Sequence, residues 1–252
     1  MKTAIITGAS VGLGREFALA AMKQFPDIEC YWLIARREEK LLEVGAELEG
    51  KTVKALPLDL CDENSFELLR QTLEAEKPEV ELLINNSGCG HLGNFDSAKL
   101  EEQTRMIDLN IRGLTAVTNL VLGYMPNGAR IVNVSSIASF CPNSRMIVYS
   151  AGKSYVSAFS RGLRDELRNR KINVTAVCPG PMDTEFITLG RIKGESPMFN
   201  FLPYCDPTKV ASGALKASAG GRAVYTPRLF FKFYRLLAKL LPKALLVKLT
   251  RT

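Results

Sequence analysis

Tyr149 and Lys153 are the two residues of this 252-residue chain whose types and spacing point most directly to chemistry. They stand four positions apart, and of the seven tyrosines only Tyr149 has a lysine four positions further on. Four residues make about one helical turn, so on a helix the phenol and the ammonium project from the same face. A cation beside a phenol favours the phenolate and lowers a pKa that is about 10 in model peptides. The pair is therefore predicted to exchange a proton with an oxygen near neutral pH.

A serine upstream strengthens this interpretation. Ser136 precedes Tyr149 by thirteen residues and follows an apolar run at 129–135, where its hydroxyl can hold the same oxygen by a hydrogen bond. The Tyr-Lys spacing alone is weak evidence, because an amphipathic helix offers such pairs on a solvated face.

The N-terminus reads as a phosphate-binding turn. A β-rich run ending at Thr7 leads into Gly8, Gly12 and Gly14 and then into an expected helix. Strand, glycine turn and helix in this order indicate dinucleotide binding. Gly8 allows a sharp turn, and the other two glycines let the backbone approach a pyrophosphate at the positive end of the helix. The spacing G-x-x-x-G-x-G differs from the common G-x-G-x-x-G, and a glycine-rich connection without a ligand is the alternative.

Strand-like and helix-like segments alternate along the chain. The strand-like runs lie at 3–7, 30–35, 52–58, 80–85, 129–135, 172–178 and 222–226. Amphipathic segments such as 38–48 and 65–76 lie between them. The alternation predicts an α/β fold, a Rossmann-type doubly wound parallel sheet with helices on both faces, in a single domain. Ligands of such a sheet bind at the carboxyl ends of the strands.

Together these motifs resemble the short-chain dehydrogenase/reductase family over roughly residues 2 to 227. The matched segments are Thr7 to Gly14, Asp59-Leu60, Asn85-Asn86-Ser87-Gly88, Asn110, Ser136 with Tyr149 and Lys153, and Pro179 to Thr184. Ser87 stands where the family has alanine, a small-for-small change. The resemblance implies a catalytic tetrad of Asn110, Ser136, Tyr149 and Lys153, an Asp-Leu pair beside the adenine, and a Pro-Gly turn beside the nicotinamide.

The end of the second expected strand indicates which nicotinamide cofactor is preferred. An acidic residue there would hold the adenosine ribose hydroxyls and select NAD. Ala35 takes that place, and Arg36 and Arg37 follow it. A small neutral residue leaves room for a 2′-phosphate, which a guanidinium binds well and to which Ser10 can also donate. NADP is therefore the expected cofactor, with Arg36 as the principal contact and Arg37 as support or over the adenine; solvated arginines are the alternative. The expected cofactor contacts are Thr7, Gly8, Ser10, Gly12, Leu13, Gly14, Arg36, Arg37, Asp59, Leu60, Asn86, Ser87, Gly88, Tyr149, Lys153, Pro179, Gly180, Met182 and Thr184.

The reaction implied by the resemblance interconverts a ketone and a secondary alcohol by hydride transfer, with Tyr149 as acid and base. Ser136 would polarise the oxygen, while Lys153 would lower the Tyr149 pKa and hold the nicotinamide ribose. Asn110 would anchor a water that relays protons to Lys153. Residues 183–207 would form a mobile lid, and its apolar side chains suggest an apolar substrate: Met198, Phe199, Phe201 and Leu202. A 3-oxoacyl compound, a steroid-like compound and a general carbonyl compound remain open.

Composition limits the setting of the protein. No run approaches the roughly 18 apolar residues of a membrane span, and the first 15 residues lack the layout of a secretory signal. The six cysteines are scattered without a C-x-x-C pair, so reduced thiols, a cytoplasmic location and no metal site are expected. Cys89 and Cys141 are expected near the pocket, and His91, the single histidine, is expected in a loop. We expect a homo-oligomer, a dimer or tetramer, without a nucleic-acid partner.

The last part of the chain carries an unusual charge. From 207 to 252 there are ten Lys or Arg residues and no acidic residue, whereas the whole chain has a net charge of +7. Within 228–241 the cations recur at helical spacing among apolar residues, and Pro242 begins a second segment. We therefore divide the chain into a domain at 1–227 and a basic amphipathic helical tail at 228–252. Such a tail suits a membrane surface or an acyl-carrier partner, but a cover over the pocket or a subunit interface also needs an apolar face.

Two interpretations from other classes of protein remain. A cofactor-binding regulator would keep the fold with a silent site, and a docking module would keep it as a scaffold for the tail. Measuring NADPH oxidation with a panel of ketones would distinguish a cofactor-binding regulator from an enzyme.

Overall fold

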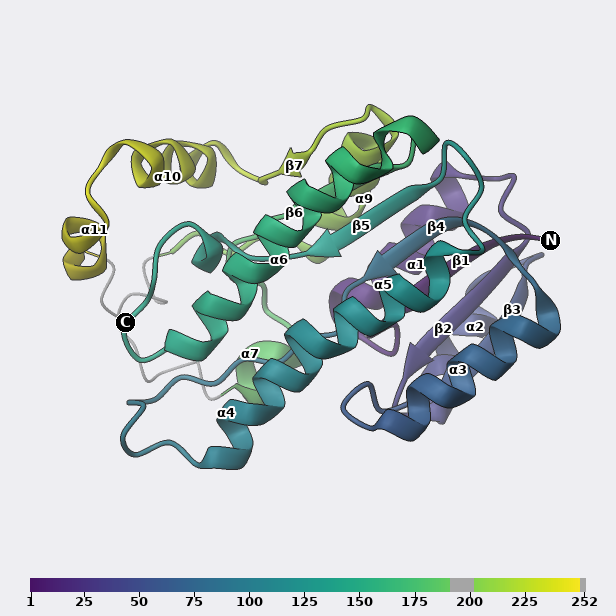
Figure 1. Ribbon diagram of the computed structural model, residues 1–252, viewed down its shortest axis with the longest axis horizontal. Helices are drawn as coiled ribbons and strands as arrows, with labels where there is room; N and C mark the ends of the chain where they lie inside the picture. Colours follow the sequence, from purple (N-terminus) through teal and green to yellow (C-terminus); the bar gives the residue numbers. More distant parts are fainter. Residues whose placement is uncertain (191–201, 250–252) are drawn as a thin grey trace.

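The computed structural model describes residues 1–190 and 202–249, and within them seven strands form one parallel sheet (Figure 1). The strands are β1 (Lys2–Thr7), β2 (Cys30–Ala35), β3 (Thr52–Pro57), β4 (Glu79–Asn85), β5 (Arg130–Val134), β6 (Asn173–Val177) and β7 (Val224–Tyr225). Their order is β3-β2-β1-β4-β5-β6-β7, and each pair of neighbours is parallel. Every strand-like run expected from the sequence is present, with ends within two residues of those predicted.

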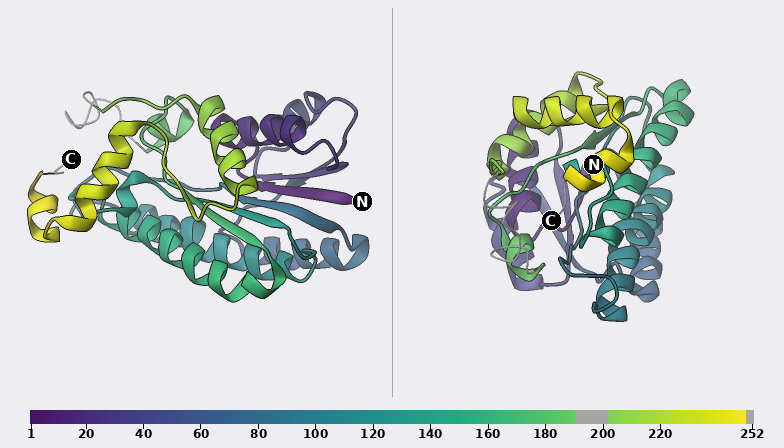
Figure 2. Two further views of the ribbon diagram at one scale, coloured as in Figure 1. Left: turned by 90° about the horizontal axis from the view of Figure 1, so that it is seen from above. Right: turned by 90° about the vertical axis from the view of Figure 1, so that its left-hand side faces the viewer.

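The helices cover both faces of the sheet (Figure 2). They are α1 (Gly12–Gln24), α2 (Glu38–Ala46), α3 (Glu63–Glu76), α4 (Leu100–Ile107), α5 (Leu114–Leu122), α6 (Ile147–Glu166), α7 (Glu185–Leu189), α9 (Pro207–Ala219), α10 (Leu229–Leu240) and α11 (Lys243–Leu249). A π-helical turn, Asp108–Gly113, joins α4 to α5, and short 3-10 turns lie at Ile137–Ser139 and Leu167–Arg170. Because helices pack on both faces, the central strands are buried almost throughout and read as continuous apolar runs.

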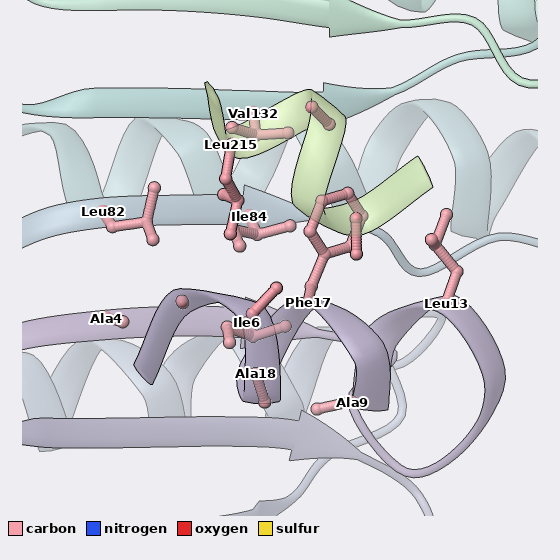
Figure 3. Packing of buried hydrophobic residues seen from close by; sticks show 14 of the residues in the cluster. Ala4, Ile6, Ala9, Leu13, Phe17, Ala18, Leu82, Ile84, Val132 and Leu215 are labelled. Atoms are coloured by element: carbon pink, nitrogen blue, oxygen red, sulfur yellow. The ribbon is translucent and has the colours of Figure 1, made fainter. Parts of the chain in front are cut away.

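Two buried cores lie on opposite faces of the sheet. One packs α1, α2 and α9 against the sheet, and Phe17 of α1 meets Leu215 of α9 over Ile6 and Ile84 (Figure 3). The other packs α3 and α5 against the opposite face through side chains such as Leu69 and Val117. The predicted doubly wound α/β sheet is confirmed.

The strand order fixes where a ligand can bind. From β1 the chain proceeds outward to β2 and β3, then returns to the other side of β1 at β4 and proceeds outward to β7. The connections after β1 and β4 therefore lead to opposite sides and leave a crevice at the carboxyl ends of these two strands.

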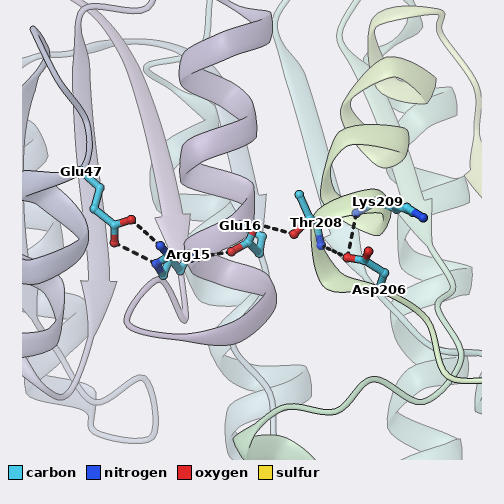
Figure 4. Close-up of polar contacts among 6 residues, drawn as sticks. All are labelled: Arg15, Glu16, Glu47, Asp206, Thr208 and Lys209. Atoms are coloured by element: carbon cyan, nitrogen blue, oxygen red, sulfur yellow. Dashed lines mark hydrogen bonds and ion pairs between the residues drawn. The ribbon is translucent and has the colours of Figure 1, made fainter.

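Polar contacts fix the first helix, which begins inside the glycine turn. Arg15, one residue after the last glycine, forms a bidentate ion pair with Glu47 (Figure 4). Glu16 accepts a hydrogen bond of 2.8 Å from the hydroxyl of Thr208, near the start of α9. Asp206 caps α9 through the N–H groups of Thr208 and Lys209. The turn is thus held between two neighbouring helices.

Candidate active site

A cavity of about 540 Å³ lies at the carboxyl ends of the strands. Its walls come from the β1–α1 turn, the ends of β2, β4 and β5, helix α6, the segment after β6, α7 and α10. The expected site residues that line it are Gly8, Ser10, Gly12, Leu13, Arg36, Arg37, Asp59, Leu60, Asn86, Ser87, Gly88, Ser136, Tyr149, Lys153, Pro179, Gly180, Met182 and Thr184. Thr7, Gly14 and Asn110 lie behind the wall.

The glycine turn has a backbone that only glycine adopts easily. Gly8 and Gly12 have φ angles of +65° and +56°. At Gly14 a Cβ would overlap the carbonyl of Gly8, so this glycine permits close packing of helix and turn. No side chain caps the start of α1, and its first turn holds no acidic residue. The N–H groups of that turn therefore remain available to an anion.

Residues after β4 brace this turn from behind. The Thr7 hydroxyl accepts hydrogen bonds of 3.0 Å from the N–H groups of Asn86 and Ser87. The Asn86 amide donates to the carbonyls of Thr7 and Gly8 at 3.2 and 3.1 Å. Thr7 is thus a structural link between β1 and β4, and Asn86 both lines the cavity and fixes the shape of the turn.

Two arginines follow β2 but have different surroundings. Arg36 and Arg37 both line the cavity, next to Ala35. Arg37 forms an ion pair of 2.8 Å with Glu185 at the start of α7, and both side chains are about half exposed. β2 itself ends in Ala35 and not in a carboxylate, and the nearby carboxylate of Glu185 is paired with Arg37.

A further arginine, which the sequence motifs did not single out, lies at the Asp59 end of the cavity. Arg105 of α4 forms an ion pair of 3.2 Å with Asp59, whose other oxygen accepts 3.0 Å from the N–H of Cys61. Burial acts to raise the Asp59 pKa, but these hydrogen bonds and the positive charge of Arg105 outweigh it and hold the pKa below its ordinary value. Arg105 also lines the cavity. Its only signal in the sequence is a cation on an amphipathic helix, 46 residues from its partner.

Ser136 and Tyr149 meet at the wall of the cavity. Ser136 follows β5, and its hydroxyl accepts a hydrogen bond of 3.1 Å from the N–H of Ala138. The hydroxyl lies close enough to the phenol of Tyr149, a residue of α6, to act on its pKa. The ring of Tyr149 packs against Phe186 of α7, with 5.7 Å between the ring centroids. Lys153 follows one turn later on α6, as the spacing predicted, and is buried.

The direction of the pKa shifts differs from the sequence expectation. Burial raises the pKa of Tyr149 to about 12, and the nearby Ser136 hydroxyl offsets only part of this. Burial likewise lowers the pKa of Lys153 to about 8. The net shift of the Tyr149 pKa in the free protein is therefore upward, opposite to the expected direction, because loss of hydration dominates. The role of Lys153 toward Tyr149 stays a prediction.

Asn110 occupies the π-helical turn between α4 and α5. Its side-chain oxygen accepts from the N–H of Cys89 at 2.9 Å, and its amide donates to the Cys89 carbonyl at 2.8 Å. A Cβ on Gly88 would lie 2.9 Å from the Asn110 oxygen and 3.2 Å from the Lys153 ammonium. Asn110 therefore secures the loop after β4 directly behind the Lys153 side chain.

The segment after β6 closes one side of the cavity. Pro179, Gly180, Met182 and Thr184 line it, and the Pro179 carbonyl accepts 3.0 Å from the N–H of Ile137. Part of the expected lid, including Met198, Phe199 and Phe201, lies outside the described residues. Within the described part of 183–207, further apolar side chains line the cavity: Phe186, Ile187 and Leu202.

The tail contributes aromatic side chains to the same wall. Phe230, Phe231 and Tyr234 of α10 line the cavity. Phe231 is fully buried, and a Cβ on Gly180 would overlap its ring. Helical periodicity had marked α10 as amphipathic, but it could not show which residues face the cavity.

Of the remaining residues singled out, one reaches the cavity. Cys89 lines it, but Cys141 does not: Cys141 is buried beneath α10 and α11, beside Ala238 and Leu246. The expectation for Cys141 is wrong because, between Ala138 and Asn143, which both line the cavity, the Cys141 side chain packs under the tail. His91 lies 3.4 Å from Glu102 and is not part of the lining.

Comparison with known proteins agrees with this site. Residues 2–190, three quarters of the chain, match the short chain dehydrogenase family. The chain belongs to this family. It is 37% identical over 199 residues to sulfoacetaldehyde reductase 2 of Chromohalobacter salexigens, covering 76% of each chain. It is also 37% identical over 184 residues to a probable NADP-dependent dehydrogenase of Haemophilus influenzae, covering 71% of this chain and 70% of that protein.

The family fold extends over almost the whole chain. A short-chain dehydrogenase from Sphingobium yanoikuyae in complex with NADPH superimposes with a TM-score of 0.81 at 27% identity. The match covers 98% of this chain and 95% of that one. The protein is therefore an oxidoreductase of the short-chain dehydrogenase/reductase family with a Rossmann-type fold.

Proposed function

We propose that this short-chain dehydrogenase reduces an apolar ketone to a secondary alcohol, and catalyses the reverse, with NADP(H). The observation that carries the proposal is that Ser136, Tyr149 and buried Lys153 lie together in the wall of one cavity that reaches the glycine turn. A phenol and a hydroxyl that converge on one point can hold a single substrate oxygen.

The glycine turn fits a dinucleotide. Its positive-φ glycines and the uncapped start of α1 leave a concave row of N–H groups without a competing side chain. When bound, NADP(H) supplies the hydride. Gly8, Gly12 and Leu13 would face the pyrophosphate; Asp59 and Leu60 would flank the adenine.

A preference for NADP over NAD rests on the end of β2. Ala35 removes the carboxylate that would hold the ribose hydroxyls, and Arg36 and Ser10 lie in the cavity wall beside it. Arg37 would contribute less, because its ion pair with Glu185 would have to loosen for it to bind phosphate. The names of the relative from Haemophilus influenzae and of the structure from Sphingobium yanoikuyae, which mention NADP and NADPH, support this preference.

Tyr149 is poised as a proton donor. With a pKa raised to about 12 by burial, its phenol carries a proton throughout the neutral range. It would give that proton to the substrate oxygen, while Ser136 holds the oxygen in place. Lys153, with its pKa lowered to about 8 by burial, exchanges a proton close to neutral pH and would restore the one that the phenol gives up.

The substrate class follows from the other side of the cavity. Near Tyr149 the wall consists largely of apolar side chains: Met146, Phe186, Ile187, Leu202, Phe230 and Phe231. Such a wall favours an apolar carbonyl compound by removing its surface from water. The 3-oxoacyl, steroid-like and general carbonyl classes are all compatible with it.

NADPH oxidation with a series of aliphatic and cyclic ketones tests the proposal. We expect turnover with NADPH well above that with NADH, and a kcat/KM that rises with the apolar surface of the ketone. The matched control to Tyr149→Phe is Tyr155→Phe, because Tyr155 lies on the same helix and pairs with Thr115 away from the cavity. NADPH binding without turnover on any ketone or alcohol would instead identify a cofactor-binding regulator.

A further inference from the structure

Helix α10 has a buried face that holds it against the body of the protein. Phe231, Tyr234 and Ala238 recur at steps of three and four residues, so they lie on one side of the helix. Phe231 is fully buried, and the ring of Tyr234 packs against Phe140 with 5.9 Å between centroids. The body of the protein therefore covers this face of α10.

The opposite face carries a row of exposed apolar side chains, here named the tail stripe. It consists of Leu229, Phe233, Leu236 and Leu240, at steps of four, three and four residues. These side chains are 81%, 60%, 52% and 71% exposed, respectively. None of the four lines the cavity, and a globular protein rarely presents four large apolar side chains in one row without a partner.

Cations flank the tail stripe. Arg228, Lys232 and Lys239 each precede a stripe residue by one position and are exposed, and Lys243 opens α11. No acidic residue occurs from 207 to 252. The surface therefore combines apolar side chains with a purely positive charge. Within the described residues no helix is long and apolar enough to span a bilayer.

Three occupants would cover this surface, and charge separates them. A second copy docked symmetrically would bring the same cations face to face, which costs energy because residues 207–252 supply no acidic residue to pair with them. An acidic protein would satisfy the cations, but it would need its own apolar groove for the full row. An anionic lipid surface satisfies both, because side chains such as Phe and Leu enter the acyl region while lysines reach the headgroups.

We propose that the tail stripe docks this protein on an anionic membrane surface. The stripe and the cavity-lining residues Phe231 and Tyr234 lie on two faces of α10. This helix lies beyond the carboxyl ends of the strands (Figure 1). If the proposed reduction of apolar ketones is correct, on which this clause rests, a bilayer would also hold the substrate next to the cavity.

Vesicle binding tests the docking separately from the reaction. The full chain should sediment with phosphatidylcholine vesicles that contain about one third phosphatidylserine, bind pure phosphatidylcholine much less, and be released by salt. The double variant Phe233→Ser with Leu240→Ser should lose at least about tenfold in affinity. The matched control is Leu42→Ser with Leu68→Ser, which removes two exposed apolar side chains, 57% and 50% exposed, from α2 and α3.

Charge reversal tests the contribution of the cations that flank the tail stripe. Lys232→Glu with Lys239→Glu should weaken binding to the same vesicles by well over tenfold, because two cations near a negative bilayer are replaced by two anions. Lys23→Glu with Lys99→Glu makes the same change in net charge at exposed positions elsewhere and should have little effect.

A fluorescent reporter locates the contact. Trp32 is the single tryptophan of the chain and is 1% exposed, so its emission should not respond to vesicles. Phe233→Trp should show a blue shift when anionic vesicles are added, and Leu68→Trp on α3 should not.

Several results would overturn the proposal. One is equal binding of the stripe variant and its control; another is a wild-type protein that ignores anionic vesicles but binds an acidic acyl-carrier protein. A third is a stripe variant that forms smaller oligomers while vesicle binding is unchanged, which would identify a subunit interface. Melting temperatures show whether each variant is folded. NADPH oxidation with a water-soluble ketone, measured without vesicles, tests the proposed reductase activity independently of membrane binding.

Discussion

The ammonium of Lys153 lies 5.8 Å from the centroid of the Tyr149 ring and donates a hydrogen bond of 2.9 Å to the carbonyl of Val134. The cation is thus held over the face of the phenol ring and tied to the end of β5. Both groups are buried, and in the free protein burial governs their protonation: the phenol keeps its proton, and the amine releases one more readily than an exposed lysine does.

Tyr149→Phe should remove most of the turnover and little of the cofactor binding. The phenol supplies both the proton and a contact to the substrate oxygen, so we expect kcat to fall by about three powers of ten. NADPH affinity, measured by fluorescence titration, should stay within a few-fold of wild type. Turnover within tenfold of wild type would show that another group supplies the proton.

Arg36→Leu should weaken NADPH and leave NADH almost unchanged. A hydrogen bond to a charged group contributes about 1.5–3 kcal/mol, and only NADPH carries the 2′-phosphate that would accept it. Arg37→Leu is the matched control, and its effect should be smaller because Arg37 is half exposed and paired with Glu185. The dissociation constants of NADPH and NADH, measured for each variant, test this prediction. Equal losses of affinity for the two cofactors would mean that Arg36 does not bind the 2′-phosphate.

The buried Lys153 should make stability depend on pH. Its pKa falls from 10.5 to about 8 on folding, so between these values the unfolded chain binds a proton that the folded chain does not. Stability therefore rises with pH across this window, by up to about 3 kcal/mol for this group, and the full cost of the buried charge is present below it.

Urea unfolding of the wild type and of Lys153→Met at about pH 7 and about pH 10 measures this term. The wild type should gain stability relative to the variant as pH rises, whereas Lys23→Met, at an exposed position, should follow the wild type. A constant difference between the wild type and Lys153→Met would mean that Lys153 keeps its ordinary pKa.

Gly180→Ala should loosen the tail. The added Cβ would overlap the buried ring of Phe231, so the ring and α10 must shift, at a cost of about 1–3 kcal/mol. Trypsin should then cleave at the cations of α10 several-fold faster than in the wild type. Gly162→Ala in α6 is the control, because a Cβ there meets nothing within 4 Å and should stabilise the helix by about 0.5–1 kcal/mol. Equal cleavage rates for Gly180→Ala and the wild type would mean that α10 does not depend on this contact.

The sequence predicted the sheet well because its strands are buried on both faces and leave continuous apolar runs. The glycine turn and the placement of Tyr149 and Lys153 on one helix were predicted equally well, since both depend on local geometry. The direction of the Tyr149 pKa shift was not, because spacing shows a neighbouring cation but not the loss of water around both groups.

Long-range contacts also could not be predicted from the sequence. Arg105 and Asp59 meet only after α4 packs beside the end of β3. The role of Phe231 depends on which side of an amphipathic helix turns inward, and periodicity is the same for either side. Assembly into a dimer or tetramer stays a prediction.

Phe231 closes the cavity from a position near the C-terminus, whereas the glycine turn stands at the N-terminus. Translation runs from the N-terminus, so the glycine turn is synthesised and can begin to fold well before the apolar side chains of α10. A chain that terminates before α10 would carry the turn, the tyrosine and the lysine, yet present an open apolar hollow to chaperones and proteases. Synthesis of α10 therefore completes the apolar wall of the cavity.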